Sequence, residues 1–390
     1  MGYLPEKLQN KLTEREKINT LRTLPKGRRG IDFSSNDYLG IAHNAMVFER
    51  AVNILSEKGL IINGATGSRL LTGNDILFKE VEELLGNIHQ AESALIFNSG
   101  YDANIGLFSS VPQRDDIVLY DEYIHASIRD GITMGKAGNY KFRHNDLNDL
   151  LSQIRRAQKN KTIGTNSQIY IVTESVFSMD GDSPDLESLS AMCDKYGCHL
   201  IVDEAHAIGI FGSNGGGKIQ ELKLQENVFA RIITFGKALG CHGAAVLGSR
   251  DLNTYLINFA RSFIYTTALP PHTLATVMAA YQFMNSSAGL REIESLHENI
   301  AHFNKESERL NISPFFISSS SAIHSCIIKG NKEVKQIAQK IQKESFDIRP
   351  ILSPTVPEGE ERLRFCLHSF NSKEDIYGIL QKLAIAIKKL

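Results

Sequence analysis

Short apolar runs alternate with amphipathic segments along the chain from about residue 31 onward. Stretches such as residues 76–90 and 185–197 place apolar side chains at helical spacing between these runs. The runs themselves are continuously apolar, which is typical of strands that are buried on both faces of a sheet. We therefore predict an α/β fold with a large, mostly parallel sheet. The expected strands are ALIFN at 94–98, DIVLYD at 116–121, QIYIVTE at 168–174, HLIVDE at 199–204, RIITF at 231–235 and AAVLG at 244–248.

The two ends of the chain have a different pattern. Residues 4–24 carry leucine and isoleucine at helical spacing among charges, and a basic, glycine-containing connector follows at 26–30. After about residue 271 a long helical stretch leads into a charged segment and a mixed C-terminal region, with no internal repeat. We predict three parts, namely an N-terminal helical arm at 1–30, a large α/β domain at 31–275 and a smaller C-terminal α+β domain at 276–390.

Composition and charge narrow the class of protein. Lys and Arg number 43 and Asp and Glu 44, and this net charge of -1 argues against a protein that mainly coats nucleic acid or an acidic membrane. No apolar run approaches the roughly 18 residues of a membrane span, and the charged N-terminus lacks the apolar segment of a secretory signal. The five scattered cysteines favour neither a disulfide framework nor a zinc site, so no metal site is predicted. We expect a reduced, cytoplasmic, globular enzyme.

Two motifs imitate the sites of nucleotide-hydrolysing proteins. Residues 203–206 spell DEAH, and GSNGGGK at 212–218 matches the first seven positions of a phosphate-binding loop. That loop needs a Ser or Thr hydroxyl after its lysine to bind Mg²⁺, and here the next residue is Ile219. The glycines also follow the acidic motif instead of following a strand. We therefore interpret 212–218 as a flexible surface loop.

A stronger group of residues lies at the predicted strand ends. Asp203 ends the run HLIV, His206 follows three residues later, and Lys237 lies among glycines after the next run. Taken alone, a lysine is most often a solvated surface charge and an aspartate a helix cap or loop residue. Together, at the edge of a parallel sheet where ligands bind, they suit an aldehyde cofactor. The lysine can form a Schiff base with such a cofactor, and the aspartate can pair with a pyridinium nitrogen.

Motifs in the same order as in one enzyme family extend this pattern over most of the chain. The sequence resembles the α-oxoamine synthases, which are pyridoxal 5'-phosphate enzymes of the aspartate-aminotransferase-like fold (fold type I). The resemblance implies that fold, with a large mixed, mostly parallel sheet domain and a smaller C-terminal α+β domain. The matching motifs are FSSNDYLG at 33–40, GATGSRLLTGN at 64–74, FNSGYDAN at 97–104, DEYIHAS at 121–127, TESVFSMDGD at 173–182, VDEAHAIGIFG at 202–212, TFGKALG at 234–240 and TTALPP at 266–271.

The resemblance implies a role for each matching cofactor residue. Lys237 is the lysine that forms the Schiff base and then moves the α-proton of the amino acid. Asp203 is the partner of the ring nitrogen, His125 stacks on the ring, and His206 donates a hydrogen bond to the phenolic oxygen. The backbone amides of Gly100 and Tyr101 would hold the phosphate at the start of a helix. The other implied cofactor-binding residues are Glu174, Ser178, Thr234, Thr266 and Thr267.

The resemblance also implies substrate and subunit contacts. Arg364, in RLRFCLHSF, matches the arginine that binds the α-carboxylate of the amino acid, a task that suits a bidentate guanidinium. The segment with Thr266 and Thr267 resembles one contributed by a neighbouring subunit, which implies a homodimer with shared active sites. The family often has histidine where this chain has Phe78 and Asn371, and neither position is expected to do obligatory chemistry. The remaining implied substrate-binding residues are Arg22, Asn36 and Tyr38.

Two segments favour one branch of the family. GKALGCHGAAVLGS at 236–249 and FARSFIYTTALPP at 259–271 most resemble the 8-amino-7-oxononanoate synthases. That branch condenses L-alanine with a pimeloyl thioester of CoA or of a carrier protein, releasing CO₂ and the free thiol, on the way to biotin. The alternatives are glycine C-acetyltransferase (2-amino-3-ketobutyrate CoA ligase), another α-oxoamine synthase, an aminotransferase on the same fold, and a catalytically silent partner subunit. The motif TESVFSMDGD argues against an aminotransferase, and the presence of Lys237 argues against a silent subunit.

Overall fold

A computed structural model describes residues 4–18, 20–24, 27, 30–159 and 166–388 of the chain. Of the predicted connector at 26–30, only Gly27 and Gly30 are among the described residues. Among the residues described, no helix combines the length and the apolar character that crossing a membrane requires.

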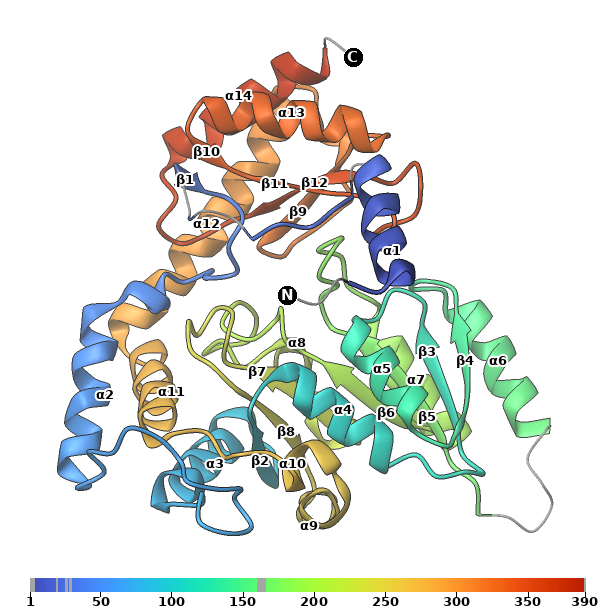
Figure 1. Cartoon of the computed structure of the whole chain (residues 1–390), viewed down its shortest axis with the longest axis vertical. Helices are drawn as coiled ribbons and strands as arrows, with labels where there is room; N and C mark the ends of the chain where they lie inside the picture. The colour runs from blue at the N-terminus through green and yellow to red at the C-terminus, as the bar shows by residue number, and fades with distance from the viewer. Residues whose placement is uncertain (1–3, 19, 25–26, 28–29, 160–165, 389–390) are drawn as a thin grey trace.

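A seven-stranded sheet forms the centre of the molecule (Figure 1). The strand order is β2-β8-β7-β6-β5-β3-β4, and β8 is the strand that runs antiparallel to both of its neighbours. The predicted mixed, mostly parallel sheet is therefore confirmed, and all six predicted runs form strands. The seventh strand, β4, was not predicted, because it lies at the edge of the sheet and is largely exposed. The strands are β2 (Ser93–Phe97), β3 (Ile117–Asp121), β4 (Gly138–Phe142), β5 (Ile169–Glu174), β6 (His199–Asp203), β7 (Ala230–Thr234) and β8 (Ala244–Gly248).

Helices cover both faces of this sheet. Successive strand side chains point to opposite faces, so Ile171 packs in one apolar cluster with α6 and α7 while Val172 packs in another with α4, α5 and α9. This two-sided burial explains why the central strands are continuously apolar. The helices around the sheet are α2 (Ala45–Glu57), α3 (Ile76–His89), α4 (Gly100–Ser110), α5 (Ala126–Met134), α6 (Leu147–Lys159), α7 (Leu186–Tyr196), α8 (Lys218–Glu221), α9 (Arg250–Phe259), α10 (Arg261–Ile264) and α11 (Pro271–Met284), with short 3-10 turns at η1 (Ile41–His43) and η2 (Gln225–Asn227).

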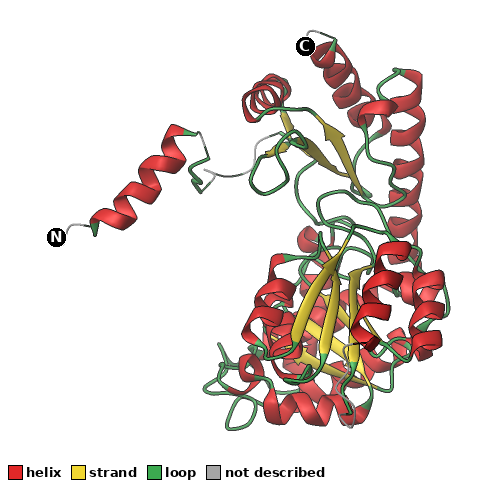
Figure 2. Cartoon of the chain, turned by 90° about the vertical axis from the view of Figure 1, so that its right-hand side faces the viewer, coloured by secondary structure: helices red, strands yellow, loops and turns green. Residues whose placement is uncertain are grey.

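The C-terminal elements form a second layer above the carboxyl ends of the parallel strands (Figures 1 and 2). A three-stranded antiparallel sheet of order β11-β12-β9 packs there with helices, as expected for a smaller α+β region. The pairing of β1 with β10 places the start of the predicted 31–275 domain against these C-terminal elements, and the domain bounds stay a prediction. The elements are β1 (Ile31–Asp32), α12 (Ser287–Arg309), η3 (Ser313–Phe315), β9 (Ile323–Ile327), α13 (Asn331–Lys343), β10 (Phe346–Asp347), β11 (Arg349–Ile351), β12 (Arg362–Cys366) and α14 (Lys373–Ile387).

The N-terminal helix is shorter than the pattern predicted. Helix α1 (Glu6–Lys17) ends before residue 20, and residues 20–24 are not helical. It buries none of its residues, and the leucines of its apolar stripe, such as Leu8 and Leu12, are exposed. Figure 2 shows α1 standing clear of the rest of the chain.

Candidate active site

Polar side chains from three neighbouring strands meet at one edge of the central sheet. Glu174 ends β5, Asp203 ends β6 and Thr234 ends β7, and Glu174 pairs directly with Asp203 in the ladder. Lys237 lies three residues beyond β7, in the turn that leads to β8. Gly240 closes this turn with a φ of +61°, and a Cβ there would lie 2.2 Å from the backbone nitrogen of Ala42. The glycine thus allows the lysine turn to pack directly against the segment that follows Asn36 and Tyr38.

Asp203 is held in place by a residue that received no role from the sequence. The Asn104 side-chain amide donates to Asp203 Oδ2 at 3.0 Å and to Ser127 Oγ at 3.0 Å. Ser127 Oγ in turn lies 2.7 Å from Nδ1 of His125. Asp203 Oδ1 accepts the backbone amide of Ala205 at 2.9 Å. Asn104 and Ser127 are the last residues of two matched motifs, so motif position was the signal that could have found them.

A continuous chain of hydrogen bonds joins Lys237 to Arg364. Lys237 Nζ lies 2.7 Å from His206 Nε2, and His206 Nδ1 lies 2.8 Å from the Tyr38 hydroxyl. The Tyr38 hydroxyl donates to Asn36 Oδ1 at 3.1 Å, and Arg364 donates to the same oxygen at 3.0 Å. The structure therefore brings all five of these predicted site residues together.

Proton accounting fixes the direction of these bonds. Arg364 can only donate, so the Asn36 atom that faces it is the amide oxygen. The Tyr38 hydroxyl, which also faces this oxygen, therefore donates its single proton to it. His206 Nδ1 therefore carries the proton donated to Tyr38, and its Nε2 offers a lone pair to Lys237. Burial, together with the charges of Lys237 and Arg364, holds the pKa of His206 well below its ordinary value, which favours this neutral form. The predicted donation from His206 to a phenolic oxygen stays a prediction, and it requires the proton on Nε2.

Arg364 offers its charge to a ligand. Its Nε donates to the backbone carbonyl of Ser178 at 2.6 Å, and its third contact is Cys366 Sγ at 3.0 Å. None of the carboxylates that the structure describes lies within ion-pairing distance of this guanidinium. Its cationic charge is thus held by neutral groups and remains uncompensated, which suits a carboxylate ligand.

Burial and neighbouring charges shift the pKa values of the central groups. Burial lowers the pKa of Lys237 to about 8, although the carboxylates of Asp203 and Glu174 oppose this change. Burial and the charge of Asp203 raise the pKa of Glu174, whose Oε1 accepts the backbone amide of His125 at 2.6 Å. Burial also lowers the pKa of His125. A lysine that loses its proton near neutral pH can act both as a nucleophile and as a base.

The predicted phosphate-binding residues surround the start of α4. Ser99 caps this helix by accepting the backbone amide of Asp102 at 3.1 Å, and Gly100 and Tyr101 begin it. The Tyr101 side chain points away to Asp130, so only its backbone amide is available to a phosphate. Next to them, the Asn98 side-chain amide donates to Thr266 Oγ1 at 2.9 Å and to the Thr267 carbonyl at 2.7 Å within the same chain.

Some of the residues considered from the sequence lie outside this group. Arg22 is exposed and lines a separate cleft of about 250 Å³ with Arg15 and residues 350–355. Phe78 is buried beneath the guanidinium of Arg69, 3.9 Å from its ring centre, and Asn371 accepts the backbone amide of His368 at 2.9 Å. Phe78 therefore packs in the core, and Asn371 holds the backbone at His368 by hydrogen bonding.

The prediction of a flexible surface loop at 212–218 is wrong for its glycines at 215–217, whereas Ser213 and Asn214 are exposed. Gly215, Gly216 and Gly217 are buried, and the Gly216 carbonyl accepts Arg231 Nη2 at 2.9 Å. Arg231 also forms a buried ion pair of 2.6 Å with Glu204, the second residue of the DEAH motif. A buried guanidinium needs several acceptors, and the glycine backbone supplies one of them at close range. The two nucleotide-like motifs thus form one structural contact.

The comparisons with known proteins agree with this geometry. The sequence pattern of the family "Aminotransferase class I and II" matches residues 28–383. The 8-amino-7-oxononanoate synthase of Emericella nidulans is 37% identical over 413 aligned residues, covering 100% of this chain and 98% of the relative. The solved 8-amino-7-oxononanoate synthase of Francisella tularensis has a TM-score of 0.75 at 28% identity, covering 92% of this chain and 98% of that chain. The solved serine palmitoyltransferase of Sphingomonas wittichii has a TM-score of 0.88 at 26% identity, covering 100% and 99%. The chain therefore belongs to the aminotransferase class I and II family and, within it, to the α-oxoamine synthases.

Proposed function

We propose that this enzyme condenses L-alanine with a pimeloyl thioester, of CoA or of a carrier protein, to give 8-amino-7-oxononanoate, CO₂ and the free thiol. The observation that carries the proposal is the convergence of Lys237, Asp203, His125 and Arg364 in one site of a chain with full-length likeness to a synthase of this kind. The product places the reaction in biotin synthesis, and we place the enzyme in the cytoplasm. Cell fractionation with an antibody to the chain tests that location.

The cofactor is pyridoxal 5'-phosphate, and the donors present fit each of its parts. The amides at the start of α4 and the Thr234 hydroxyl suit the phosphate. Gly100 and Thr234 lie side by side here, because a Cβ built on Gly100 would lie 3.8 Å from the Thr234 hydroxyl. Each oxygen of Asp203 makes one hydrogen bond and retains a lone pair, which suits a protonated ring nitrogen. When bound, the cofactor supplies an aldehyde for the amine and an electron-withdrawing ring that stabilises negative charge at the α-carbon.

The side chains of this chain divide the remaining work. Arg364 binds the carboxylate of alanine and so fixes which α-carbon bond faces Lys237. Lys237 takes the α-proton and later returns one to the same carbon, for which its lowered pKa is suited. With the cofactor bound, Asp203 would keep the ring nitrogen protonated, and His125 would pack against the ring. Overall, a bond forms between the α-carbon and the acyl carbonyl carbon as the C–S bond breaks, the bond to the α-carboxylate breaks to release CO₂, and one proton from the solvent is taken up so that both the thiol and the α-carbon are protonated.

A homodimer completes the proposal. Several large apolar side chains near the site are exposed, including Leu71 and Tyr265, which suits a surface covered by a second subunit. Tyr265 directly precedes the threonines that the family resemblance assigns to a neighbouring active site. Sedimentation of the purified protein at micromolar concentration tests this state, and a monomer there would contradict it.

A substrate matrix tests the reaction. Holoenzyme is mixed with L-alanine, glycine, L-serine or L-threonine and with pimeloyl-CoA, acetyl-CoA or palmitoyl-CoA, and thiol release is measured. We expect the highest kcat/KM for L-alanine with pimeloyl-CoA. Preference for glycine with acetyl-CoA would overturn the proposed substrates and identify a glycine C-acetyltransferase. Preference for serine with palmitoyl-CoA would identify a serine palmitoyltransferase.

A further inference from the structure

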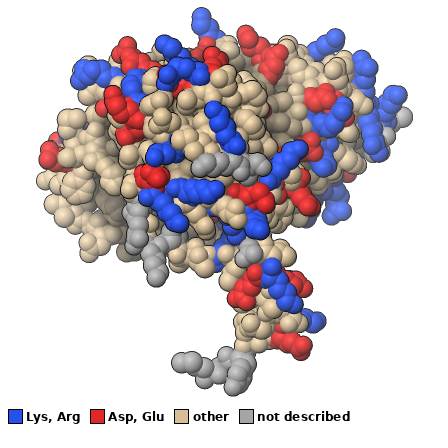
Figure 3. Space-filling model, turned by 90° about the horizontal axis from the view of Figure 1, so that it is seen from above, with Lys and Arg blue, Asp and Glu red and all other residues tan. Residues whose placement is uncertain are grey.

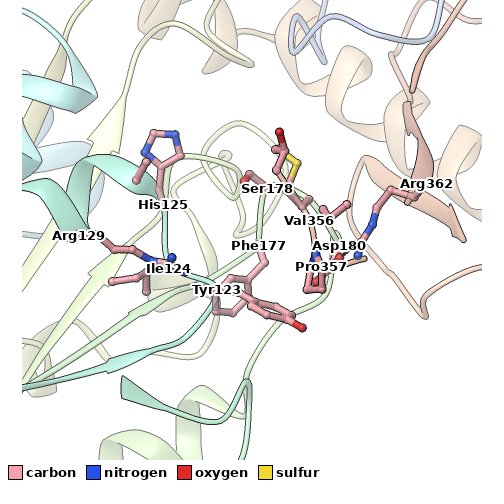
Figure 4. Close-up of a pocket in the computed structure, with 13 residues that line it drawn as sticks. Tyr123, Ile124, His125, Arg129, Phe177, Ser178, Asp180, Val356, Pro357 and Arg362 are labelled. Atoms are coloured by element: carbon pink, nitrogen blue, oxygen red, sulfur yellow. Dashed lines mark ion pairs between the residues drawn. The ribbon is translucent and has the colours of Figure 1, made fainter. Parts of the chain in front are cut away.

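A cavity of about 290 Å³ opens beside the candidate active site (Figure 4). It is bordered by His125 and by Ser178, whose backbone carbonyl accepts Arg364, and so it lies next to the proposed amino-acid site. Its wall is mainly apolar, and the side chains that provide this wall are Ile124, Phe177, Met179, Val356 and Pro357. An apolar wall next to the reacting centre suits the methylene chain of an acyl group.

Two arginines line this cavity, and they differ in their partners. Arg362 is almost fully buried, forms an ion pair with Asp180 and lies 3.4 Å from a Glu360 carboxylate oxygen. Its charge is therefore compensated. Arg129 lies across the cavity, on the side of Ile124 and His125 (Figure 4), and its guanidinium donates to the backbone carbonyl of Glu122. Among the described residues, no carboxylate forms an ion pair with Arg129.

The acidic groups near Arg129 are already engaged. The Glu122 carboxylate accepts the backbone amide of His144 at 3.2 Å and lies 3.4 Å from Lys141. Asp130 accepts the Tyr101 hydroxyl at 2.7 Å. Asp180 is the only acidic residue that lines the cavity within the described chain, and it is paired with Arg362. The lining thus has one uncompensated positive charge, at Arg129.

The position of Arg129 sets the distance from the reacting centre to this charge. His125 caps α5 and Arg129 lies four residues later, on the same face of the helix and about 6 Å further along its axis. The backbone of Arg129 therefore lies about one helical turn from His125, with Ile124 of the apolar wall on the same side of the cavity (Figure 4). A carboxylate at the end of an acyl chain would match the guanidinium in charge and in its two-donor geometry.

We propose that this cavity binds the acyl chain of the thioester and that Arg129 binds a carboxylate at the far end of that chain. The proposal rests on the proposed function and deepens it, because it states why an acyl group with a terminal carboxylate is preferred to a simple fatty acyl group. Replacing such a carboxylate by a methyl group leaves Arg129 without its anion, and the preference follows from that loss.

The experiment compares two donors that differ only at the chain end. Pimeloyl-CoA and heptanoyl-CoA each have seven acyl carbons, and only the first carries a terminal carboxylate. Both kcat/KM with L-alanine and the dissociation constant of each thioester are measured for holoenzyme. We expect Arg129→Gln to weaken binding of pimeloyl-CoA and its kcat/KM by about 10- to 100-fold, and to change the values for heptanoyl-CoA far less. Arg129→Lys retains the charge without the two-donor fork, so we expect an intermediate loss.

The control is Arg114→Gln, because Arg114 is exposed and lies before the amino end of β3, whereas the site lies at the carboxyl ends of the strands. This variant should change neither the kcat/KM nor the dissociation constant of either donor. Equal losses for both donors in Arg129→Gln, or no loss for either, would overturn the role of Arg129. A wild-type enzyme that binds the two thioesters equally would overturn it as well. If wild-type enzyme binds pimeloyl-CoA with an Arg129-dependent preference but turns over no amino acid with it, the proposed function fails and the subsite stands.

Discussion

In the part of the chain that the structure describes, each side of the site has an arginine without a carboxylate partner, and the two sides differ in how many neutral groups hold that arginine. On the amino-acid side, Arg364 is linked to Lys237 through three side chains by hydrogen bonds of 2.7 to 3.1 Å. On the acyl side, the wall is apolar, and its uncompensated cation, Arg129, donates only to a backbone carbonyl among the contacts described.

This difference assigns the proton transfers to the amino-acid side and the choice of acyl group to the acyl side. A continuous hydrogen-bond network holds its groups in one geometry, which suits the proton transfers that every amino acid substrate requires. An apolar wall beside one cation that is unpaired among the described residues, Arg129, can change by single substitutions without disturbing that network. The two solved relatives, one named for an oxononanoate and one for a palmitoyl group, share this fold. We infer that members with different acyl groups can share the network and differ in the wall.

Substitution of Lys237 has the largest expected effect, and it tests the hydrogen-bonded network on the amino-acid side. We expect Lys237→Ala to lower kcat by at least about 10⁴-fold, since both proton transfers use this amine. Borohydride reduction followed by mass spectrometry should fix the cofactor on the wild-type chain and not on the variant. Lys79→Ala, an exposed lysine of α3, serves as the control. Retained turnover in Lys237→Ala would refute its assignment.

Arg364 tests the other end of the same network. We expect Arg364→Lys to raise KM for L-alanine by about 100-fold, because a lysine cannot hold a carboxylate with two parallel hydrogen bonds. KM for the acyl thioester should change little, since the two sides are separate. Arg250→Lys on the exposed face of α9 is the matched control. A comparable rise in KM for the thioester would show that the two sides are not independent.

Tyr38 tests whether the links between the ends matter. Tyr38→Phe removes the hydroxyl that joins His206 to Asn36 and leaves a buried Nδ1 proton without an acceptor. We expect kcat to fall about tenfold and its pH profile to move, because the protonation of His206 is no longer fixed. Tyr140→Phe, on the exposed strand β4, is the control. A lower melting temperature with an unchanged pH profile would assign Tyr38 a structural role only.

The sequence predicted the parts of the fold that repeat locally. Strands such as β5 and β6 are buried at almost every position, because both of their faces are covered, and their central residues are apolar. Strand β4 was not predicted, because it lies at the edge of the sheet and Phe142 is its only buried residue. The glycines at 215–217 were misjudged as surface, because the acceptor that Arg231 needs in the core does not show in a local pattern.

The residues of the site could be predicted from the sequence, but the hydrogen bonds between them could not. Parallel strands end at a common edge, so Asp203 and Lys237 could be expected to meet there. The bonds between Tyr38 and His206 and between Asn36 and Arg364 join residues 168 and 328 positions apart. Contacts across such separations depend on how whole layers pack, which local spacing does not encode.

His144 provides the mildest test, because it lies behind the apolar wall of the acyl cavity. Its ring stacks on Tyr123 and meets the edge of Phe177, both of which line the cavity. Its two nitrogens each lie 2.9 Å from a carboxylate, of Asp121 and of Asp182. Burial alone would lower the pKa of His144, but these hydrogen bonds outweigh it and raise the pKa to about 9. The apolar wall thus packs against a partly buried charge.

The raised pKa of His144 makes this support depend on pH. Stabilisation by the charged ring is complete below its ordinary pKa of about 6.5 and is lost as the pH rises through about 9. It amounts to about 3 kcal/mol at most, or a few degrees in melting temperature. We expect His144→Gln to melt below wild type at pH 6 and to approach it at pH 10, whereas the exposed His43→Gln should match wild type throughout. A gap that stays constant with pH would mean that His144 supports the wall by packing alone and that the charge of its ring contributes nothing to that support.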